Sequence, residues 1–335
     1  MLQKFDFDDI LIKAAPISKI RSRSEISEFH TNQTLPIFAS PMDTVVSAQN
    51  LSEFTKLNIN VCLPRGEKAP DKSQTMVFES FSLTQVEQKL KENKELPNFT
   101  LIDIANGHMQ ALVDVTRQLK QQQPSMSLMV GNIANTETFK ELSQAGADYI
   151  RVGIGNGAGC LTTQNAAVGY PMASLIKECF DIKTKHSLSA KIVADGGFKD
   201  YADIIKGLAL GADYIMLGSV LNKAIESCGQ SDWNGIALSD TFAKFLYNRG
   251  FRIHKSFRGM STKAVQKKWG AKTLKTSEGV TRRRPVQYTL AGWVDNLRHY
   301  LKSNMSYCNA RSLDQYIGQA EINFITQKAQ KRFAK

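Results

Sequence analysis

Short apolar segments alternate along the chain with longer amphipathic ones. Eight of the apolar segments are rich in β-branched residues, and several are continuously apolar, as expected for strands covered on both faces of a parallel sheet. The predicted strands cover 36–40, 58–63, 75–80, 99–105, 128–133, 149–154, 191–196 and 214–219. The segments with helical periodicity cover 84–92, 109–122, 136–145, 171–186 and 200–210.

The ends of these helical segments carry the residues expected there. Thr136 and Asp200 precede or open two of them in the manner of N-caps. Gly146 and Gly211 follow two of them, and each begins a Gly-Ala-Asp triplet that leads into the next strand. The boundaries therefore agree with the alternation of strands and helices.

Eight strands that alternate with helices predict an α/β fold, a (β/α)8 TIM barrel, rather than a doubly wound sheet. No GxGxxG motif opens a helix after the first strand, which argues further against a dinucleotide-binding doubly wound sheet. We expect one barrel domain over residues 1–310 and a C-terminal tail over 311–335 that forms a surface helix or a frayed end.

Two connections after predicted strands are too long for plain turns. Residues 153–170 hold five glycines and a cysteine, and residues 227–288 follow the last strand as a long flap with helical pieces. Long loops in compact domains are usually functional or disordered. We therefore expect function at 153–170 and a partly mobile flap over 227–288.

The chain has 335 residues and a formal net charge of +12, from 43 basic and 31 acidic residues. Such a charge attracts phosphate-bearing partners, whether nucleotides or nucleic acids. Part of the excess lies in the C-terminal third, which is typical of a solvated basic face. No nucleic-acid partner is expected.

The five cysteines are widely spread and show no paired CxxC spacing, which argues against a disulfide scaffold and a zinc site. No run of about 18 apolar residues occurs, so no membrane association is expected. The N-terminus lacks the apolar segment of a secretory signal. These features predict a reduced, cytoplasmic protein.

The most informative stretch is Val152-Gly153-Ile154-Gly155-Asn156-Gly157-Ala158-Gly159-Cys160. Alternate glycines let the backbone approach a ligand or ion closely and adopt positive φ. A cysteine at the end of such a loop, after a barrel strand, is poised as a nucleophile. On residue types alone, an inert cysteine in a glycine-rich turn is the alternative.

At this point the chain resembles the barrel enzymes of the IMP dehydrogenase and GMP reductase family over roughly residues 5–310. The resemblance rests on the order and spacing of many short motifs. They are Phe7-Asp8-Asp9, Ser22-Arg23-Ser24-Glu25, Pro41-Met42-Asp43, Asp103-Ile104-Ala105-Asn106-Gly107-His108, Gly131-Asn132, the Cys160 loop, Gly169-Tyr170-Pro171, Ala194-Asp195-Gly196-Gly197, Met216-Leu217-Gly218-Ser219, Arg258-Gly259-Met260-Ser261 and Ser277-Glu278-Gly279.

The resemblance implies catalytic roles for three residues. Cys160 matches the nucleophile that attacks C2 of the purine and forms a thioimidate, and Thr162 matches the threonine near the leaving group. Glu278 matches the glutamate that works with the threonine in proton transfer to the departing ammonia. From residue types alone, Thr162 also fits a helix cap and Glu278 a solvated loop acid.

The resemblance also implies binding residues. For the substrate, Asp195 matches the carboxylate that holds the ribose, and Gly218 and Ser219 match the phosphate site. The segments that lie over the phosphate and the base in the family match Gly259, Met260, Ser261, Ser277 and Gly279. The positions implied for the dinucleotide are Ser22, Arg23, Asp103, Ile104, Ala105, Ile154 and Gly155. The carbonyls implied for a potassium ion belong to Gly155, Gly157 and Cys160. Asp195 also fits a turn residue at a strand end.

Within the family, the reductase reaction is favoured: NADPH-dependent reductive deamination of GMP to IMP and ammonia. Only 17 positions separate Ser261 from Glu278, which resembles the short reductase flap. No Arg-Tyr pair occurs between them, and no long regulatory insertion interrupts the barrel. The resemblance further implies a purine nucleoside monophosphate as substrate and a homotetramer.

The chain departs from the family pattern at several positions. Asn156 stands where proline is usual, Leu161 and Thr163 replace the usual threonine and arginine, and Lys275 stands where reductases tend to have arginine. The strand-two lysine and histidine cluster is replaced by residues 63–68. The alternatives are IMP dehydrogenase, a reductase of a modified or deoxy purine nucleotide, a flavin-containing oxidoreductase, and a silent barrel that binds nucleotide or RNA.

Overall fold

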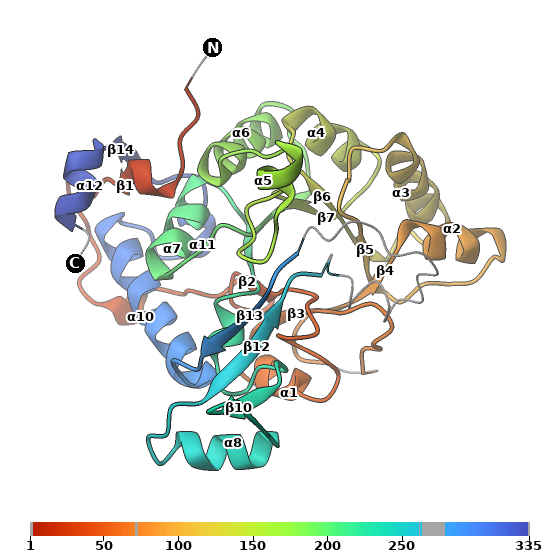
Figure 1. Cartoon of the computed structure of the whole chain (residues 1–335). Coiled ribbons are helices and arrows are strands. Elements are labelled where there is room, and N and C mark those ends of the chain that lie inside the picture. The colour runs from red at the N-terminus through yellow and green to blue at the C-terminus, as the bar shows by residue number, and fades with distance from the viewer. Residues whose placement is uncertain (1–2, 71–72, 261, 263–278, 334–335) are drawn as a thin grey trace.

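Eight parallel strands close into a barrel in the computed structural model of the chain, which describes residues 3–70, 73–260, 262 and 279–333 (Figure 1). The strands follow one another in chain order, and the last pairs with the first. They are β2 (Ile37–Ala39), β3 (Asn60–Leu63), β4 (Val77–Phe81), β5 (Phe99–Asp103), β6 (Ser127–Ile133), β7 (Tyr149–Val152), β8 (Lys191–Asp195) and β9 (Tyr214–Leu217). The predicted TIM barrel and its eight predicted strands are confirmed.

Helices cover the outside of the barrel between the strands (Figure 1). They are α1 (Leu51–Thr55), α2 (Leu83–Lys91), α3 (Gln110–Gln122), α4 (Thr136–Gln144), α6 (Met172–Lys185), α7 (Tyr201–Leu210) and α10 (Leu290–Tyr307). The short helix α5 (Thr162–Ala166) has no buried residues and lies in the loop after β7. The five predicted helical segments correspond to α2, α3, α4, α6 and α7. Asp200 caps α7, since its Oδ1 accepts the N–H of Asp203 at 3.0 Å, and Gly211 ends that helix at φ +120°.

The inside of the barrel is filled by side chains. Phe38, Phe78, Tyr149 and Tyr214 meet edge to face or tilted, with ring centroids 5.1–6.3 Å apart. Alternation along each strand explains this packing, because Phe38 points inward while Ile37 and Ala39 pack against the outer helices. The barrel interior is therefore a solid core, so a ligand of the barrel would bind at the ends of the strands rather than inside it.

The C-terminal region differs from the predicted tail. Strand β14 (Ile322–Phe324) pairs antiparallel with β1 (Ile10–Ile12) near the N-terminus, and α11 (Leu313–Tyr316) packs on the barrel. Tyr316 is 1% exposed and donates its hydroxyl to Asn304 Oδ1 at 2.7 Å. In the described part of residues 311–335, α12 (Gln327–Phe333) is the surface helix, and none of its residues is buried. The sequence pattern did not predict this packing, because a strand of three residues such as β14 forms only through its pairing with β1 at the other end of the chain.

The described part of the region after β9, where a partly mobile flap with helical pieces is predicted, forms a small antiparallel sheet in the order β11-β10-β12-β13, and residues 261 and 263–278 of that flap lie outside the described residues. Its strands are β10 (Ser231–Trp233), β11 (Ile236–Leu238), β12 (His254–Arg258) and β13 (Thr281–Pro285), and α8 (Asp240–Tyr247) is its one described helix. The polar sequence of β13 gave no strand signal, and its pairing with all five residues of β12 makes it a strand. Short 3₁₀ helices complete the fold at η1 (Phe7–Asp9), η2 (Arg23–Glu25) and η3 (Leu221–Lys223).

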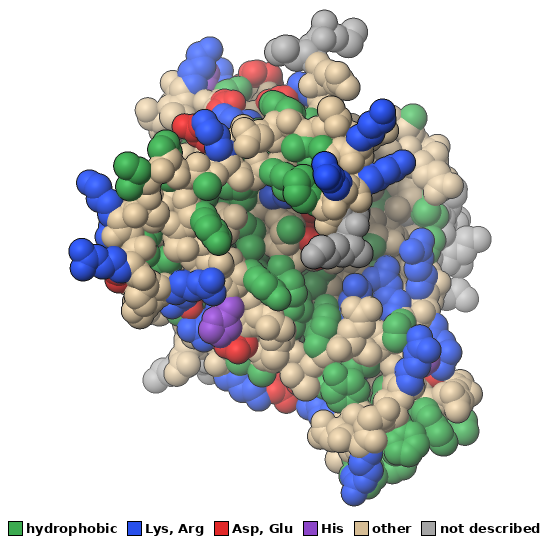
Figure 2. Space-filling view, turned by 90° about the vertical axis from the view of Figure 1, so that its left-hand side faces the viewer, with side chains coloured by type: hydrophobic (Ala, Val, Ile, Leu, Met, Phe, Trp, Pro, Cys, Tyr) green, Lys and Arg blue, Asp and Glu red, His purple; other side chains and the backbone are tan. Residues whose placement is uncertain are grey.

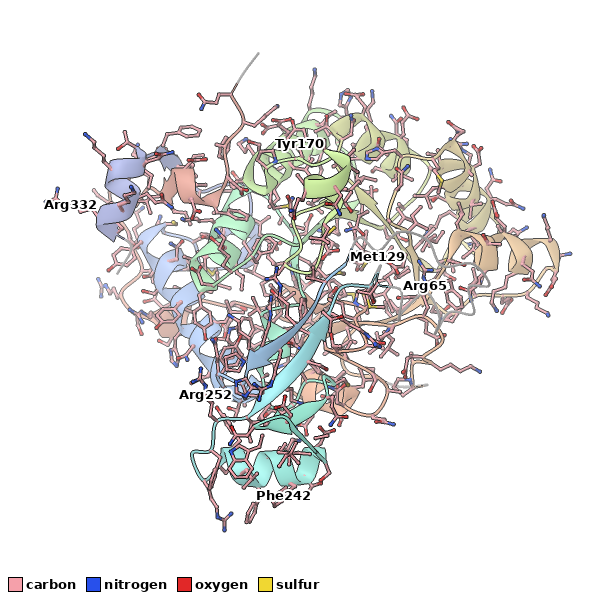
Figure 3. The ribbon with its side chains drawn as sticks, viewed as in Figure 1. Arg65, Met129, Tyr170, Phe242, Arg252 and Arg332 are labelled. Atoms are coloured by element: carbon pink, nitrogen blue, oxygen red, sulfur yellow. The ribbon has the colours of Figure 1, made fainter. Side chains whose placement is uncertain are left out.

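The far end of this sheet exposes large apolar side chains. Ile236, Phe242, Phe245 and Phe251 are 41–63% exposed, and hydrophobic side chains gather at the lower edge of the face in Figure 2. Figure 3 shows Phe242 and Arg252 at this end, away from Arg65 at the barrel. Among the described residues, no helix has the length and hydropathy to cross a bilayer.

A buried carboxyl group on α7 makes stability depend on pH. Burial raises the pKa of Asp203 to about 6 and outweighs the N–H of Lys199, which donates to its Oδ2 at 2.9 Å. The folded protein therefore binds this proton more tightly than the unfolded chain. Its contribution favours the native state below about pH 4 and is lost as the pH rises through about 6.

We predict that Asp203→Asn flattens this dependence. Between about pH 4.5 and about pH 7.5 the wild-type protein should lose on the order of 1–3 kcal/mol of unfolding free energy relative to the variant. Urea unfolding at both pH values measures the difference, and Asp181→Asn on the exposed face of α6 serves as the control. An equal pH slope in wild type and Asp203→Asn would contradict the prediction.

Candidate active site

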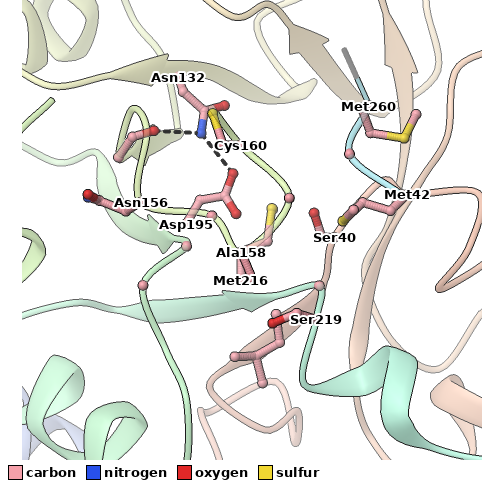
Figure 4. Close-up of a pocket in the computed structure, with 18 of the residues that line it drawn as sticks. Ser40, Met42, Asn132, Asn156, Ala158, Cys160, Asp195, Met216, Ser219 and Met260 are labelled. Atoms are coloured by element: carbon pink, nitrogen blue, oxygen red, sulfur yellow. Dashed lines mark hydrogen bonds between the residues drawn. The ribbon is translucent and has the colours of Figure 1, made fainter. Parts of the chain in front are cut away.

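A cavity of about 600 Å³ opens at the carboxyl ends of the barrel strands, where β12 also borders it. This is the end at which TIM-barrel enzymes build their active sites, because the loops after the strands converge there. Figure 4 shows Asp195 and Asn132 on one side of the cavity and Met42 and Met260 on the other. The walls therefore combine polar groups with the adaptable thioether side chains that pack against flat ligands.

Cys160 lies on the loop after β7 and lines the cavity. Its side chain is half-buried, and its thiol donates to Thr162 Oγ1 at 3.2 Å. When the sulfur is ionised, the same contact lets the hydroxyl donate to the thiolate. The structure thus presents the thiol to the cavity with a hydroxyl beside it, which is not the arrangement of an inert buried cysteine.

The Cys160 loop is held in place by the sheet after β9. Val280 donates its N–H to the carbonyl of Gly159 at 3.2 Å, and Cys160 bridges to Gly279. The two chains approach so closely that a Cβ on Gly259 would lie 2.3 Å from the carbonyl oxygen of Gly159. Glycine is therefore required at 259 by sterics, and the loop depends on β12 and β13 for its position.

Two carboxylates on the cavity wall share one arginine. Arg151, in the middle of β7, donates to Asp103 Oδ1 and to Asp195 Oδ2, each at 2.7 Å. Asn132 Nδ2 also donates to Asp195 Oδ2 at 2.7 Å. Among the described residues no hydrogen bond engages Asp195 Oδ1, so this oxygen is available to a ligand.

The electrostatics of this group are those of a compensated buried ion cluster. The Arg151 side chain is 6% exposed, and burial disfavours its charge, but Asp195 and Asp103 outweigh that penalty and raise the pKa of Arg151. Arg151 therefore stays charged near neutral pH, held between two carboxyl side chains. Arg65 adds a second cation, since it donates to the carbonyl of Asp103 and lies 3.3 Å from its carboxylate.

The loop after β9 supplies Gly218 and Ser219 to the cavity. A Cβ on Gly218 would lie 2.6 Å from Sδ of Met42, so a larger residue would close this corner. In TIM barrels the loops after the last two strands, with a short extra helix, commonly bind phosphate. Here those loops follow β8 and β9, and η3 is the short helix.

The cavity brings together most of the site residues that the sequence predicted. Those on its wall are Asp103, Ile104, Ala105, Ile154, Gly155, Gly157, Cys160, Thr162, Asp195, Gly218, Ser219, Gly259 and Met260. Gly279 contacts Cys160 through the backbone bridge. Arg23 begins η2 and Ser22 is its N-cap, and neither lines this wall. Ser261, Ser277 and Glu278 lie outside the described residues.

Three carbonyls were predicted to hold a potassium ion. The carbonyl of Gly157 accepts the N–H of Cys160 at 2.9 Å, which uses one of its two lone pairs. Gly155 has φ +83°, which turns the backbone at this point of the loop. A carbonyl with a second lone pair and an adaptable glycine backbone fit an oxygen-coordinated cation.

Sequence reasoning missed several cavity residues. Arg151 carried a usable signal, because a charged residue inside the apolar strand Tyr149-Ile150-Arg151-Val152 must find a buried partner. Lys223 and Arg284 carried none, because the sequence does not reveal that β13 returns beside the short helix after β9.

The chain matches the family model for the IMP dehydrogenase / GMP reductase domain over residues 84–333. Several known proteins are similar to it along nearly their whole length. A human protein named GMP reductase 2 is 29% identical over 99% of this chain and 97% of its own. GMP reductases of Phytophthora infestans and Shewanella pealeana are each 29% identical, over 99% and 93% of this chain and 93% and 92% of their own lengths.

The barrel and its cavity define an enzyme-like α/β protein with a thiol at the mouth. The chain belongs to the IMP dehydrogenase / GMP reductase family, and the resemblance found in the sequence is confirmed.

The Arg151 cluster yields a stability prediction. Arg151→Met removes the buried cation shared by two part-buried carboxylates and leaves only Arg65 beside Asp103, so it should lower the free energy of unfolding by about 3 kcal/mol. Arg151→Lys keeps the charge but not the two-pronged geometry, so its loss should be smaller. Urea unfolding measures both variants. Arg117→Met removes an exposed ion pair with Asp114 and should change stability by only about 0–1 kcal/mol. An Arg151→Met loss as small as that of the control would refute the interpretation.

Proposed function

We propose that the protein is a GMP reductase, which converts GMP to IMP and ammonia with NADPH as the reductant. The observation that carries the proposal is a cavity in which one loop presents Cys160 and Thr162 while other walls carry Asp195 and the Gly218–Ser219 loop. The similarity to proteins named GMP reductase supports the same reaction. A purine nucleoside monophosphate has groups that suit each wall.

In this proposal the Cys160 thiolate adds to C2 of the guanine ring. The bond between C2 and the exocyclic amino group then breaks, and that group takes a proton and leaves as ammonia. The product of this step is a thioimidate in which the sulfur is bonded to C2. Delivery of a hydride to C2 and breakage of the C–S bond release IMP and restore the thiolate. Thr162 lies within hydrogen-bond distance of the sulfur and would relay protons with Glu278.

The carboxylate of Asp195 would hold the ribose. Its Oδ2 is fixed by Arg151 and Asn132, and its Oδ1 can accept a hydroxyl. Gly218 and Ser219 would bind the phosphate, while Gly259 and Met260 with Ser261, Ser277 and Gly279 would cover the base and phosphate. Holding both ends of the nucleotide positions C2 against the sulfur, which is the main physical contribution of such a site.

A reduced nicotinamide dinucleotide, NADPH in our proposal, supplies the hydride when bound. Asp103, Ile104, Ala105, Ile154 and Gly155 would hold it, with Ser22 and Arg23 as further contacts. The first five line the same cavity as Cys160, and a carboxylate such as Asp103 can accept hydroxyl groups in addition to its arginine partners. The residues present therefore fit the dinucleotide.

We further propose a potassium ion on the carbonyls of Gly155, Gly157 and Cys160, where it would stiffen the loop that carries the thiol. The protein would act as a cytoplasmic homotetramer. All five cysteines are unpaired, as is usual in a reducing compartment, and the exposed apolar side chains around α8 are of the kind that a second copy can cover.

We predict that the protein consumes NADPH in the presence of GMP and releases IMP and ammonia. Absorbance of the dinucleotide and chromatography of the nucleotide measure both sides of the reaction. NADH formation from IMP and NAD, with no NADPH consumed with GMP, would favour IMP dehydrogenase and overturn the proposal. Parallel reactions with deoxy-GMP and with NADH test the sugar and the dinucleotide, and a yellow purified protein would indicate a flavin.

We predict that Cys160→Ala abolishes turnover, with a loss of about three orders of magnitude or more. Cys308→Ala removes another half-buried cysteine outside the cavity and is the matched control. Iodoacetamide should inactivate the wild type, and GMP should slow that inactivation. Full activity in Cys160→Ala would favour a nucleotide-binding barrel without thiol chemistry.

A further inference from the structure

Five cationic side chains line the cavity within the described part of the chain, and two of them lack an acidic partner there. Arg65 and Arg151 pair with the carboxylates of Asp103 and Asp195, and Lys199 lies 3.1 Å from Asp8. No ion pair or hydrogen bond among the described residues engages the side chains of Lys223 and Arg284. The imbalance is therefore confined to one part of the wall.

The fold brings these two side chains together from distant segments. Lys223 ends η3, directly after the loop of Gly218 and Ser219. Arg284 lies on β13, which returns beside η3, because the N–H of Gln287 donates to the carbonyl of Lys223 at 3.0 Å. The Arg284 guanidinium stacks on the ring of Phe257, 4.3 Å from its centroid, which orients it at the cavity wall.

The surroundings do not neutralise these charges. Burial lowers the pKa of Lys223, and the nearby Arg284 lowers it further, while Asp200 acts in the opposite direction without outweighing them. Burial and Arg282 likewise lower the pKa of Arg284. Two half-buried cations that repel each other cost free energy unless an anion joins them.

We propose that Lys223 and Arg284 form a phosphate clamp that selects a nucleoside monophosphate in its dianionic form. The two positive charges match the two negative charges of a phosphate monoester, and both side chains adjoin the loop of Gly218 and Ser219. Arg284 can contact two phosphate oxygens at once, whereas Lys223 acts as a point charge. The inference rests on the proposed function, since it assigns substrate selection at the same site.

The clamp acts on binding rather than on the chemical step. It contacts a part of the nucleotide that does not react, so its removal weakens the ground state and the transition state alike. KM should rise while kcat stays nearly unchanged. Affinity should also fall as the pH drops below about 6, where a phosphate monoester takes up its second proton.

The test compares Lys223→Met and Arg284→Met with the wild type. Each variant should raise KM and the dissociation constant for GMP about 10- to 100-fold, with kcat within about twofold. Arg282→Met is the matched control, because it removes a positive charge from the same strand at an exposed position off the cavity wall. Arg282→Met should change KM and the dissociation constant by less than about threefold, because it removes only a long-range, solvent-screened charge.

Calorimetric binding of GMP and guanosine separates the phosphate from the rest of the ligand. Guanosine should bind the wild type and both clamp variants equally, because it carries no phosphate. Unchanged GMP affinity in the variants, an equal loss in Arg282→Met, or an equal loss of guanosine affinity would overturn the proposal. Tighter binding of GDP or GTP than of GMP would also overturn it, because the clamp would then accept more than two charges.

Failure of the clamp and failure of the proposed function give different results. If the wild type binds GMP without turnover, and the clamp variants lose that binding, the reductase proposal fails and the clamp stands. If the wild type reduces GMP and the variants keep their KM, the clamp fails and the reductase stands. If the wild type binds neither GMP nor inorganic phosphate, both fail.

Discussion

The mouth of this barrel depends on one buried guanidinium. Arg151 joins three strands, because it sits on β7 and holds a carboxylate from β5 and another from β8. Buried charges are tolerated only when they are paired and hydrogen-bonded, so each carboxylate must keep the orientation that the arginine imposes. That constraint directs the hydrogen bonds of Arg151 and Asn132 to Oδ2 of Asp195 and leaves Oδ1 for the proposed ribose, so the core sets the position of that proposed site.

Different parts of the cavity wall carry different chemistry. The cationic end lies beside the loop after β9, the carboxylates lie at the ends of β5 and β8, and methionines line the wall that faces Asp195 (Figure 4). A nucleotide offers a group to each of these, with an anionic phosphate, a hydroxylated sugar and a flat base. The thiol of Cys160 opens into the same space, so the base of such a ligand would lie within reach of a nucleophile.

The sequence allowed the fold to be predicted because the signals for a barrel are local. Each buried strand is a short apolar run, and each helix has its own periodicity and caps, so the eight strands and five main helices could be read independently. Cys160 was found in the same way, from a glycine-rich loop after a strand. The strands of the small sheet and β14 could not be read, because β13 is Thr-Arg-Arg-Arg-Pro and forms only through its pairing with β12. Lys223 and Arg284 were missed for the same reason, since their proximity follows from that pairing.

The small sheet after β9 links the two ends of the candidate site. Through Gly259 and Val280 it contacts the Cys160 loop, and through Arg284 it reaches the wall beside η3. Strands β12 and β13 are paired along all five of their residues, so a shift of one strand moves the other. An anion that binds Arg284 therefore stabilises the same pair of strands that holds the cysteine loop. The same two strands therefore border the cysteine loop and the proposed phosphate end, and both parts of the site depend on one strand pairing for their position.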